Sequence, residues 1–203
     1  MTRVIGLTGG IASGKSNVSN ALKKAGVPVV DADQVSRSLT ADGGEALPML
    51  RDAFGDDVFA GDSLDRRRLA ELVFSDGEAL RRLNALMHPL ILERIDRQLN
   101  ELREQGVPAA VLDAPLLFEA GLEGRCDEVW CVWLPQKEQL RRLCARDGLT
   151  QAQGLRRIRS QMPTLQKKRR ADRVIDTRGT PGESAAQALA LLKQAVSGEN
   201  ENE

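Results

Sequence analysis

A glycine-rich segment near the N-terminus has the residue types and spacing of a phosphate-binding loop. It reads Gly9-Gly10-Ile11-Ala12-Ser13-Gly14-Lys15-Ser16 and satisfies the pattern G-x-x-x-x-G-K-[S/T] in full. The glycines let successive backbone N–H groups point inward, where they can hold phosphate oxygens together with the N-terminus of a following helix. In that chemistry Lys15 bridges the β- and γ-phosphates of a nucleotide, and the Ser16 hydroxyl ligates Mg²⁺.

Such a loop needs a strand before it and a helix after it, and the flanking sequence predicts both. Residues 3–8 read as a buried strand, and residues 15–25 form an amphipathic stretch that stops at Gly26. The alternative, a glycine turn with a solvated lysine, would not require this context.

Four further short apolar runs predict the rest of a sheet. Near-continuous hydrophobicity is typical of strands buried on both faces, as in a parallel sheet. The sequence therefore predicts one α/β domain over residues 1–203 with a three-layer P-loop NTPase fold, a five-stranded parallel sheet and a closing helix over residues 180–196. The four runs are residues 27–31, 109–113, 128–133 and 173–176.

Two helical insertions interrupt this domain. The first, about residues 34–106, is expected to be helical from about Ala46 to Glu104, with a helix starting at Asp65. The second, about residues 136–172, is basic and is expected to form a helical lid. The acidic tail, residues 198–203, is expected to be frayed.

Composition excludes several classes of protein. The 29 basic and 29 acidic side chains cancel, so global charge indicates no partner. Three cysteines without a C-x-x-C pair and the single histidine, His88, support neither a disulfide framework nor a zinc site.

No signal peptide or run of 18 apolar residues is present, which favours the cytoplasm. No asparagine precedes a lysine, so the guanine-reading motif of GTPases is missing, and Asp176-Thr177-Arg178-Gly179 is interpreted as a turn.

Carboxylates stand where two predicted strands end. Because the carboxyl ends of parallel strands open onto the ligand crevice, a carboxylate there can take the proton of an attacking hydroxyl or hold the water shell of a metal ion. Asp33 is the candidate base. Either Asp31 or Asp33 could instead cap the following helix, and Asp113 could either contact Mg²⁺ or cap a turn.

Along nearly its whole length the chain resembles the dephospho-coenzyme A kinase family. The collinear segments that carry the resemblance are the glycine-rich loop, Asp31-Ala32-Asp33, Leu86-Met87-His88-Pro89, the run Asp113-Ala114-Pro115-Leu116-Leu117-Phe118-Glu119, and Arg170-Ala171-Asp172. The resemblance implies that ATP and dephospho-coenzyme A are the partners and that the γ-phosphate passes to the 3′-hydroxyl of the acceptor ribose, with Asp33 as general base.

Two loop residues depart from the family pattern. Asn17 stands where threonine is usual, and Ala12 replaces a common glycine. Asn17 could still offer an amide to the α-phosphate, whereas the methyl group of Ala12 limits how the loop bends.

The acceptor site is expected around His88 and in the loop after residue 113. Because a residue before proline avoids the α region, a helix is predicted to break at His88 and another to start at Pro89. A lone histidine is more often structural, but the matching His-Pro segment of the family favours acceptor binding. The same resemblance places the acceptor at Leu116, Phe118 and Glu119.

Eleven basic residues lie between Arg141 and Arg173, against Asp147 and Asp172. This segment suits a lid whose arginines neutralise charge on the transferred phosphoryl group. Most of these side chains could simply be solvated, and only Arg142, Arg157 and Arg170 are selected as ATP contacts. A nucleic-acid-binding module is the alternative outside enzymes, but no aromatic residue interrupts the segment to stack on bases. The alternative within enzymes is a kinase for another small hydroxyl or nucleotide acceptor.

Overall fold

The computed structural model describes residues 1–197, so the expected fraying of the tail concerns residues outside the described part of the chain. The chain divides into two compact units. Residues 1–30 and the chain from Glu101 onward form the first unit, and Asp31–Asn100 form the second.

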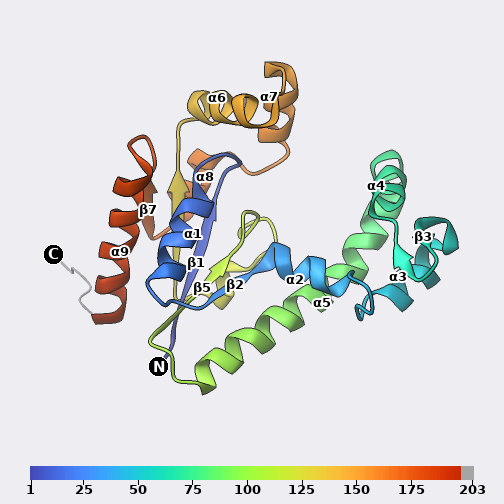
Figure 1. Cartoon of the computed structure of the whole chain (residues 1–203), viewed down its shortest axis with the longest axis horizontal. Helices are drawn as coiled ribbons and strands as arrows, with labels where there is room; N and C mark the ends of the chain where they lie inside the picture. The colour runs from blue at the N-terminus through green and yellow to red at the C-terminus, as the bar shows by residue number, and fades with distance from the viewer. Residues whose placement is uncertain (198–203) are drawn as a thin grey trace. The chain divides into compact units, whose positions relative to one another are not determined.

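The first unit is built on a five-stranded parallel sheet (Figure 1). Its strand order is β2-β5-β1-β6-β7. All five predicted strands are confirmed, although the second begins two residues later than expected. The bounds are β1 Arg3–Gly9, β2 Val29–Asp31, β5 Ala109–Asp113, β6 Glu128–Trp133 and β7 Arg173–Asp176.

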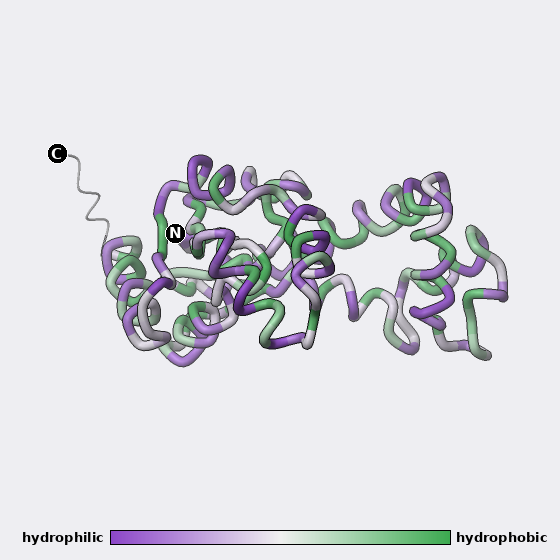
Figure 2. Tube along the Cα trace, turned by 90° about the horizontal axis from the view of Figure 1, so that it is seen from above, coloured by the Kyte–Doolittle hydropathy of each residue, from purple (hydrophilic) through white to green (hydrophobic). Residues whose placement is uncertain are grey.

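Helices of the first unit bury an apolar face against this sheet. Val18 and Leu22 of α1 and Ala188 of α9 lie in one core cluster with strand residues such as Ile5 and Trp130. Figure 2 shows hydrophilic and hydrophobic residues interspersed along the helices, and an amphipathic helix gathers its apolar residues on one face because they recur every three or four positions. The helices are α1 Lys15–Lys24, η2 Glu123–Arg125, α6 Gln136–Asp147, α7 Gln151–Arg159, α8 Thr164–Arg170 and α9 Pro181–Ser197.

The second unit is mostly helical. Asp65 starts a helix as predicted, because its carboxylate accepts hydrogen bonds from the N–H groups of Arg67 and Arg68. The region expected to be helical, about Ala46 to Glu104, also contains a two-stranded hairpin at residues 59–64, which turns at Gly61 with a φ of 65°. The elements are α2 Ala32–Leu39, α3 Leu47–Phe54, η1 Asp56–Val58, β3 Phe59–Ala60, β4 Ser63–Leu64, α4 Arg66–Ser75 and α5 Gly77–Glu104, of which residues 101–104 belong to the first unit.

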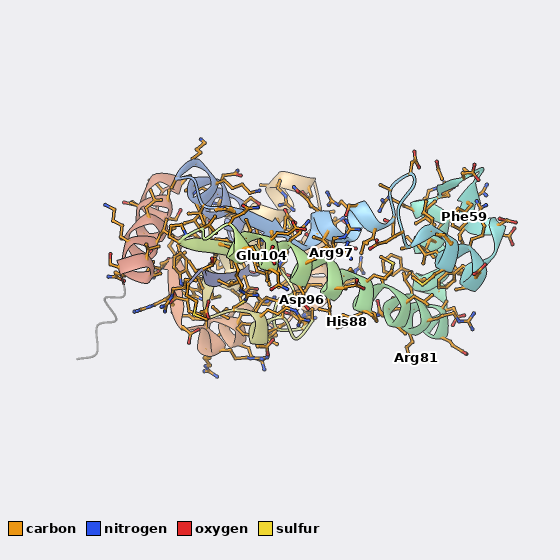
Figure 3. All side chains as sticks on the ribbon, turned by 90° about the horizontal axis from the view of Figure 1, so that it is seen from below. Phe59, Arg81, His88, Asp96, Arg97 and Glu104 are labelled. Carbon is orange, nitrogen blue, oxygen red and sulfur yellow. The ribbon has the colours of Figure 1, made fainter. Side chains whose placement is uncertain are left out.

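The predicted helix break at His88 is wrong. Helix α5 runs without interruption from Gly77 to Glu104 with Pro89 inside it, and Figure 3 shows His88 on this helix between Arg81 and Asp96. Proline cannot donate to the carbonyl four residues earlier, which costs a helix interior about 3 kcal/mol. Burial of Met87, Ile95 and Leu99 along the same helix offsets that cost.

Candidate functional site

The glycine-rich loop joins the carboxyl end of β1 to the start of α1. Gly14 takes a φ of 91° as the residue before α1, and Ala12 takes a φ of 58° although it is not a glycine. An L-residue in this left-handed region costs roughly 1–2 kcal/mol. The departure at Ala12 therefore leaves the bend in place at an energetic cost, as strained backbone at ligand sites often does.

Lys15, the first residue of α1, forms an ion pair with Asp113 at the carboxyl end of β5. Leu7 and Asp113 are register partners in the adjacent strands β1 and β5, which places the carboxylate beside the loop. Asp113 is only 4% exposed, so the pair is largely shielded from water. The structure thus brings together two residues that the sequence analysis assigned to different tasks.

Ser16 and Asn17 continue α1 past the lysine. Ser16 is exposed, whereas the Asn17 side chain donates hydrogen bonds to the Pro181 carbonyl (2.8 Å) and to Ser184 Oγ (3.2 Å). The amide that was expected to reach an α-phosphate therefore ties α1 to the first turn of α9.

A small pocket of about 140 Å³ lies beside this end of the loop. Thr177 belongs to the segment that the sequence analysis interprets as a turn. Its hydroxyl donates a hydrogen bond to the Ser13 carbonyl at 2.6 Å, which fixes this part of the loop. A position directly after the carboxyl end of β7 was the signal that could have identified this segment. The lining residues are Gly14, Asn17, Arg142, Thr177, Gly179, Thr180, Pro181 and Ser184.

Of the three selected arginines, Arg142 lies at this pocket. It donates to the Thr177 carbonyl at 2.9 Å and to Glu138. The pKa of Glu138 is lowered to about 2, mainly by the hydrogen bonds from Arg141 and to a lesser extent by the one from Arg142. This carboxylate therefore stays charged beside Arg142.

The other two selected arginines are held by carboxylates elsewhere in the first unit. Arg157 pairs with Asp147 at 2.8 Å. Arg170 pairs with Glu123 at 2.6 Å and lies 4.3 Å over the ring of Phe118. Neither lines the pocket beside the glycine-rich loop.

The loop after β5 contains the residues expected to contact the acceptor. Leu116 is 45% exposed, whereas Phe118 is buried. Glu119 accepts a hydrogen bond from the Met162 N–H at 2.8 Å and pairs with Lys167 at 2.9 Å. Lys167 is fully buried, and the sequence analysis missed it because it stands in a basic run that reads as solvent-exposed.

The remaining predicted site residues belong to the second unit. Asp31 caps α2, because its carboxylate accepts a hydrogen bond from the Gln34 N–H at 3.0 Å, so the structural interpretation of Asp31 is confirmed. Asp33 is exposed in the first turn of α2. His88 and Pro89 lie within α5.

The cysteines have the properties of structural residues. Burial raises the pKa of Cys126 and of Cys131 to about 12, which keeps both as thiols at neutral pH. Within residues 1–197, no cluster of three or more histidine, cysteine or acidic side chains could hold a metal ion. Among the helices described, none has the length and apolar character needed to span a bilayer.

A family model and curated relatives identify the family of this chain. The family model described as "Dephospho-CoA kinase" matches residues 3–182. The chain is 42% identical to a dephospho-CoA kinase of Carboxydothermus hydrogenoformans, over 94% of this chain and 93% of that one. It is 45% identical to a dephospho-CoA kinase of Geobacter sulfurreducens, over 89% and 92% of the two chains.

Solved structures agree at the level of the fold. A Thermus thermophilus protein superposes with a TM-score of 0.81 at 39% identity, covering 95% of this chain and 97% of that one. A dephospho-CoA kinase from Campylobacter jejuni superposes with a TM-score of 0.76 at 24% identity, covering 98% of this chain and 100% of that one.

Proposed function

The chain belongs to the dephospho-coenzyme A kinase family, and from that premise we propose how its own residues transfer the γ-phosphate of ATP to the 3′-hydroxyl of the ribose of dephospho-coenzyme A. The observation that carries the proposal is the position of Lys15, at the start of α1 and against Asp113 at the end of β5. A cation held at the end of a phosphate-binding loop serves phosphoryl transfer, which depends almost entirely on positioning and electrostatic stabilisation.

ATP binding is assigned to the loop and the pocket beside it. N–H groups of the loop, residues 9–16, receive the phosphates, apart from the Ser13 N–H, which donates to the Gly10 carbonyl at 3.1 Å. Lys15 turns from Asp113 toward the β- and γ-phosphates. The planar guanidinium of Arg142 lies at the pocket, where it can stack on a base. Asn17 donates a hydrogen bond to Pro181 of α9 and so keeps that wall of the pocket in place. Arg157 and Arg170 are proposed as ATP contacts from the lid, residues 136–172.

The residues beside Lys15 fit Mg²⁺. The exposed Ser16 hydroxyl and the Asp113 carboxylate would hold this ion, because both offer the oxygen donors that it prefers. When bound, the ion neutralises charge on the phosphates.

Asp33 is proposed as the general base for the acceptor hydroxyl. Because Asp31 already caps α2, Asp33 is not needed for that structural task. The second unit is proposed as the acceptor lobe, with contacts from His88 and Pro89. Leu116, Phe118 and Glu119 are proposed to contact the acceptor from the first unit. The three free cysteines suit a reducing compartment, and we place the reaction in the cytoplasm.

An ADP-release assay across a panel of hydroxyl acceptors tests the function. Dephospho-coenzyme A should support turnover far above adenosine, shikimate and gluconate, and coenzyme A should not, because its 3′-hydroxyl is already phosphorylated. Lys15→Met serves as the background control. Preferred turnover of another acceptor would overturn the proposed substrate, and ADP release that survives in Lys15→Met would overturn the assigned phosphate site.

A further inference from the structure

The connector between α7 and α8, residues 160–163, rests on the glycine-rich loop. The Ile11 N–H donates a hydrogen bond to the Gln161 side-chain oxygen at 3.1 Å. This N–H belongs to the loop whose inward N–H groups bind phosphate oxygens. A neutral amide oxygen therefore occupies one of the backbone N–H donors of this loop.

Neighbouring residues fix the connector in this place. Gln139 is buried, and its amide donates to the Leu134 carbonyl at 2.8 Å and to Thr164 Oγ1 at 2.7 Å. Thr164 lies so close to Gly10 that a Cβ on Gly10 would collide with its hydroxyl. Close approach of α8 to the loop thus explains why glycine stands at position 10.

Gln161 also has room to leave the loop. It lines a cavity of about 550 Å³ whose other walls include Trp133, Ile158 and Leu165. A side chain that gives up its hydrogen bond to Ile11 can move into this space without repacking the core.

A second set of contacts links the connector to the loop after β5. Next to Gln161, the Met162 N–H donates to Glu119, and Glu119 pairs with the buried Lys167. Lys167 in turn donates to the Pro115 carbonyl, which also accepts from Thr8 Oγ1 at 3.1 Å. Because removing a partner of a fully buried cation is costly, these contacts tie the connector to residues 115–119.

We propose that Gln161 is a positioning residue: it occupies a phosphate-binding N–H of the loop in the nucleotide-free enzyme and yields it when a nucleotide binds. Its release shifts the connector and, through Glu119 and Lys167, reports nucleotide occupancy to residues 115–119. The inference rests on the proposed function only in treating residues 115–119 as acceptor-binding. The hydrogen bond from Ile11 competes directly with nucleotide, whatever the acceptor is.

Two substitutions with opposite expected effects test the competition. Gln161→Ala removes the competing acceptor, and the usual net strength of one hydrogen bond implies about twofold to tenfold tighter binding. Gln161→Glu places a carboxylate on the same N–H, which strengthens the competing bond and repels phosphate, so binding should weaken about tenfold. A merely structural role predicts that both variants weaken binding.

Calorimetric titration of ADP and of a non-hydrolysable ATP analogue, each with Mg²⁺, measures these effects without turnover. Gln166→Ala is the matched control, since Gln166 is an exposed glutamine on α8 outside the proposed contacts. Its affinity should equal that of the wild type. Unchanged or weaker binding by Gln161→Ala overturns the competition.

The link to residues 115–119 has its own measurement. In the wild type the affinity for dephospho-coenzyme A should differ with and without the ATP analogue, and in Gln161→Ala the two values should converge. If the ratio of these two affinities is the same in Gln161→Ala as in the wild type, the link is overturned. If the wild type binds nucleotide but does not phosphorylate dephospho-coenzyme A, the proposed function fails while the nucleotide titrations still decide the role of Gln161.

Discussion

At the scale of single residues, the site contains an ion pair, Lys15 and Asp113, in which each charge compensates the other. The side chains of Lys15 and Asp113 are 16% and 6% exposed, and each is the ion-pair partner of the other. Removing one partner of a buried pair leaves an uncompensated charge and typically costs 3–5 kcal/mol, whereas replacing both is much less costly. Stability and catalysis are therefore coupled at Lys15.

A double-mutant cycle separates the two effects. Lys15→Met should lower the free energy of unfolding by about 3 kcal/mol, because Asp113 stays buried without its cation. Adding Asp113→Asn should restore most of that loss but none of the kinase activity. Urea unfolding and ADP release measure the two quantities. A double variant no more stable than Lys15→Met would contradict the coupling.

Asp33→Asn tests the general base. The change keeps size and hydrogen bonding but removes the ability to take a proton, so kcat should fall about a hundredfold or more, with both substrates still bound. The measurement is steady-state kinetics across a magnesium titration. A true base leaves a loss that persists at saturating metal, whereas a role in ordering the metal's water shell leaves one that added Mg²⁺ partly relieves.

Asp31→Asn is the control for that experiment, two residues away on the same segment. Asparagine caps a helix as well as aspartate does, so this variant should keep both its stability and its turnover. Near-normal turnover of Asp33→Asn would exclude Asp33 as the base.

At the scale of elements, α5 shows how a long helix accommodates a residue that disfavours it. Pro89 lies inside the helix, and the Ala85 carbonyl cannot receive a hydrogen bond from it. Pro89 thus lowers the stability of α5 at a segment that is proposed to bind the acceptor. Functional sites commonly have lower stability than the rest of a protein.

Pro89→Ala should therefore stabilise the protein, by at most about 3 kcal/mol. If Pro89 contacts the acceptor, the same variant should raise the KM for dephospho-coenzyme A. Thermal unfolding and steady-state kinetics give the two readings. A loss of stability would show that the helix depends on the proline ring for packing.

His88→Ala should weaken use of dephospho-coenzyme A while leaving ATP affinity, measured by titration, unchanged. His88 lies in the second unit, and the glycine-rich loop lies in the first. An equal loss of ATP affinity would place the histidine in the nucleotide site or show that its role is structural.

At the scale of the whole molecule, carboxylates outside residues 141–173 pair with several basic side chains of that segment. Lys167 pairs with Glu119 and Arg170 with Glu123, both distant along the chain, and Arg142 pairs with Glu138 one turn earlier on α6. Such pairing leaves less charge available for a phosphate backbone and argues against the nucleic-acid alternative.

Filter binding checks that conclusion. At moderate salt, single-stranded RNA and duplex DNA should be bound no more tightly than the roughly 10⁻⁴ M limit of weak non-specific binders, with little dependence on salt. Tight binding with a steep salt dependence would revive the nucleic-acid alternative.

Local sequence patterns were enough to predict several features of this protein. The spacing from Gly9 to Ser16 identified the phosphate-binding loop, and continuous apolar runs located all five strands of the sheet. These signals are local because a strand buried on both faces must be apolar at nearly every position. The role of Asp65 at the start of α4 was readable for the same reason, since a cap involves only its own helix.

Features that depend on distant partners became apparent only in the folded structure. Nothing local distinguishes the buried Lys167 from its solvated neighbours, because its burial is set by Glu119 and Pro115, 48 and 52 residues away along the chain. Gln161 contacts Ile11 across 150 residues. The continuity of α5 through Pro89 was likewise unreadable from sequence, since burial elsewhere on the helix outweighs the local preference of the residue before proline.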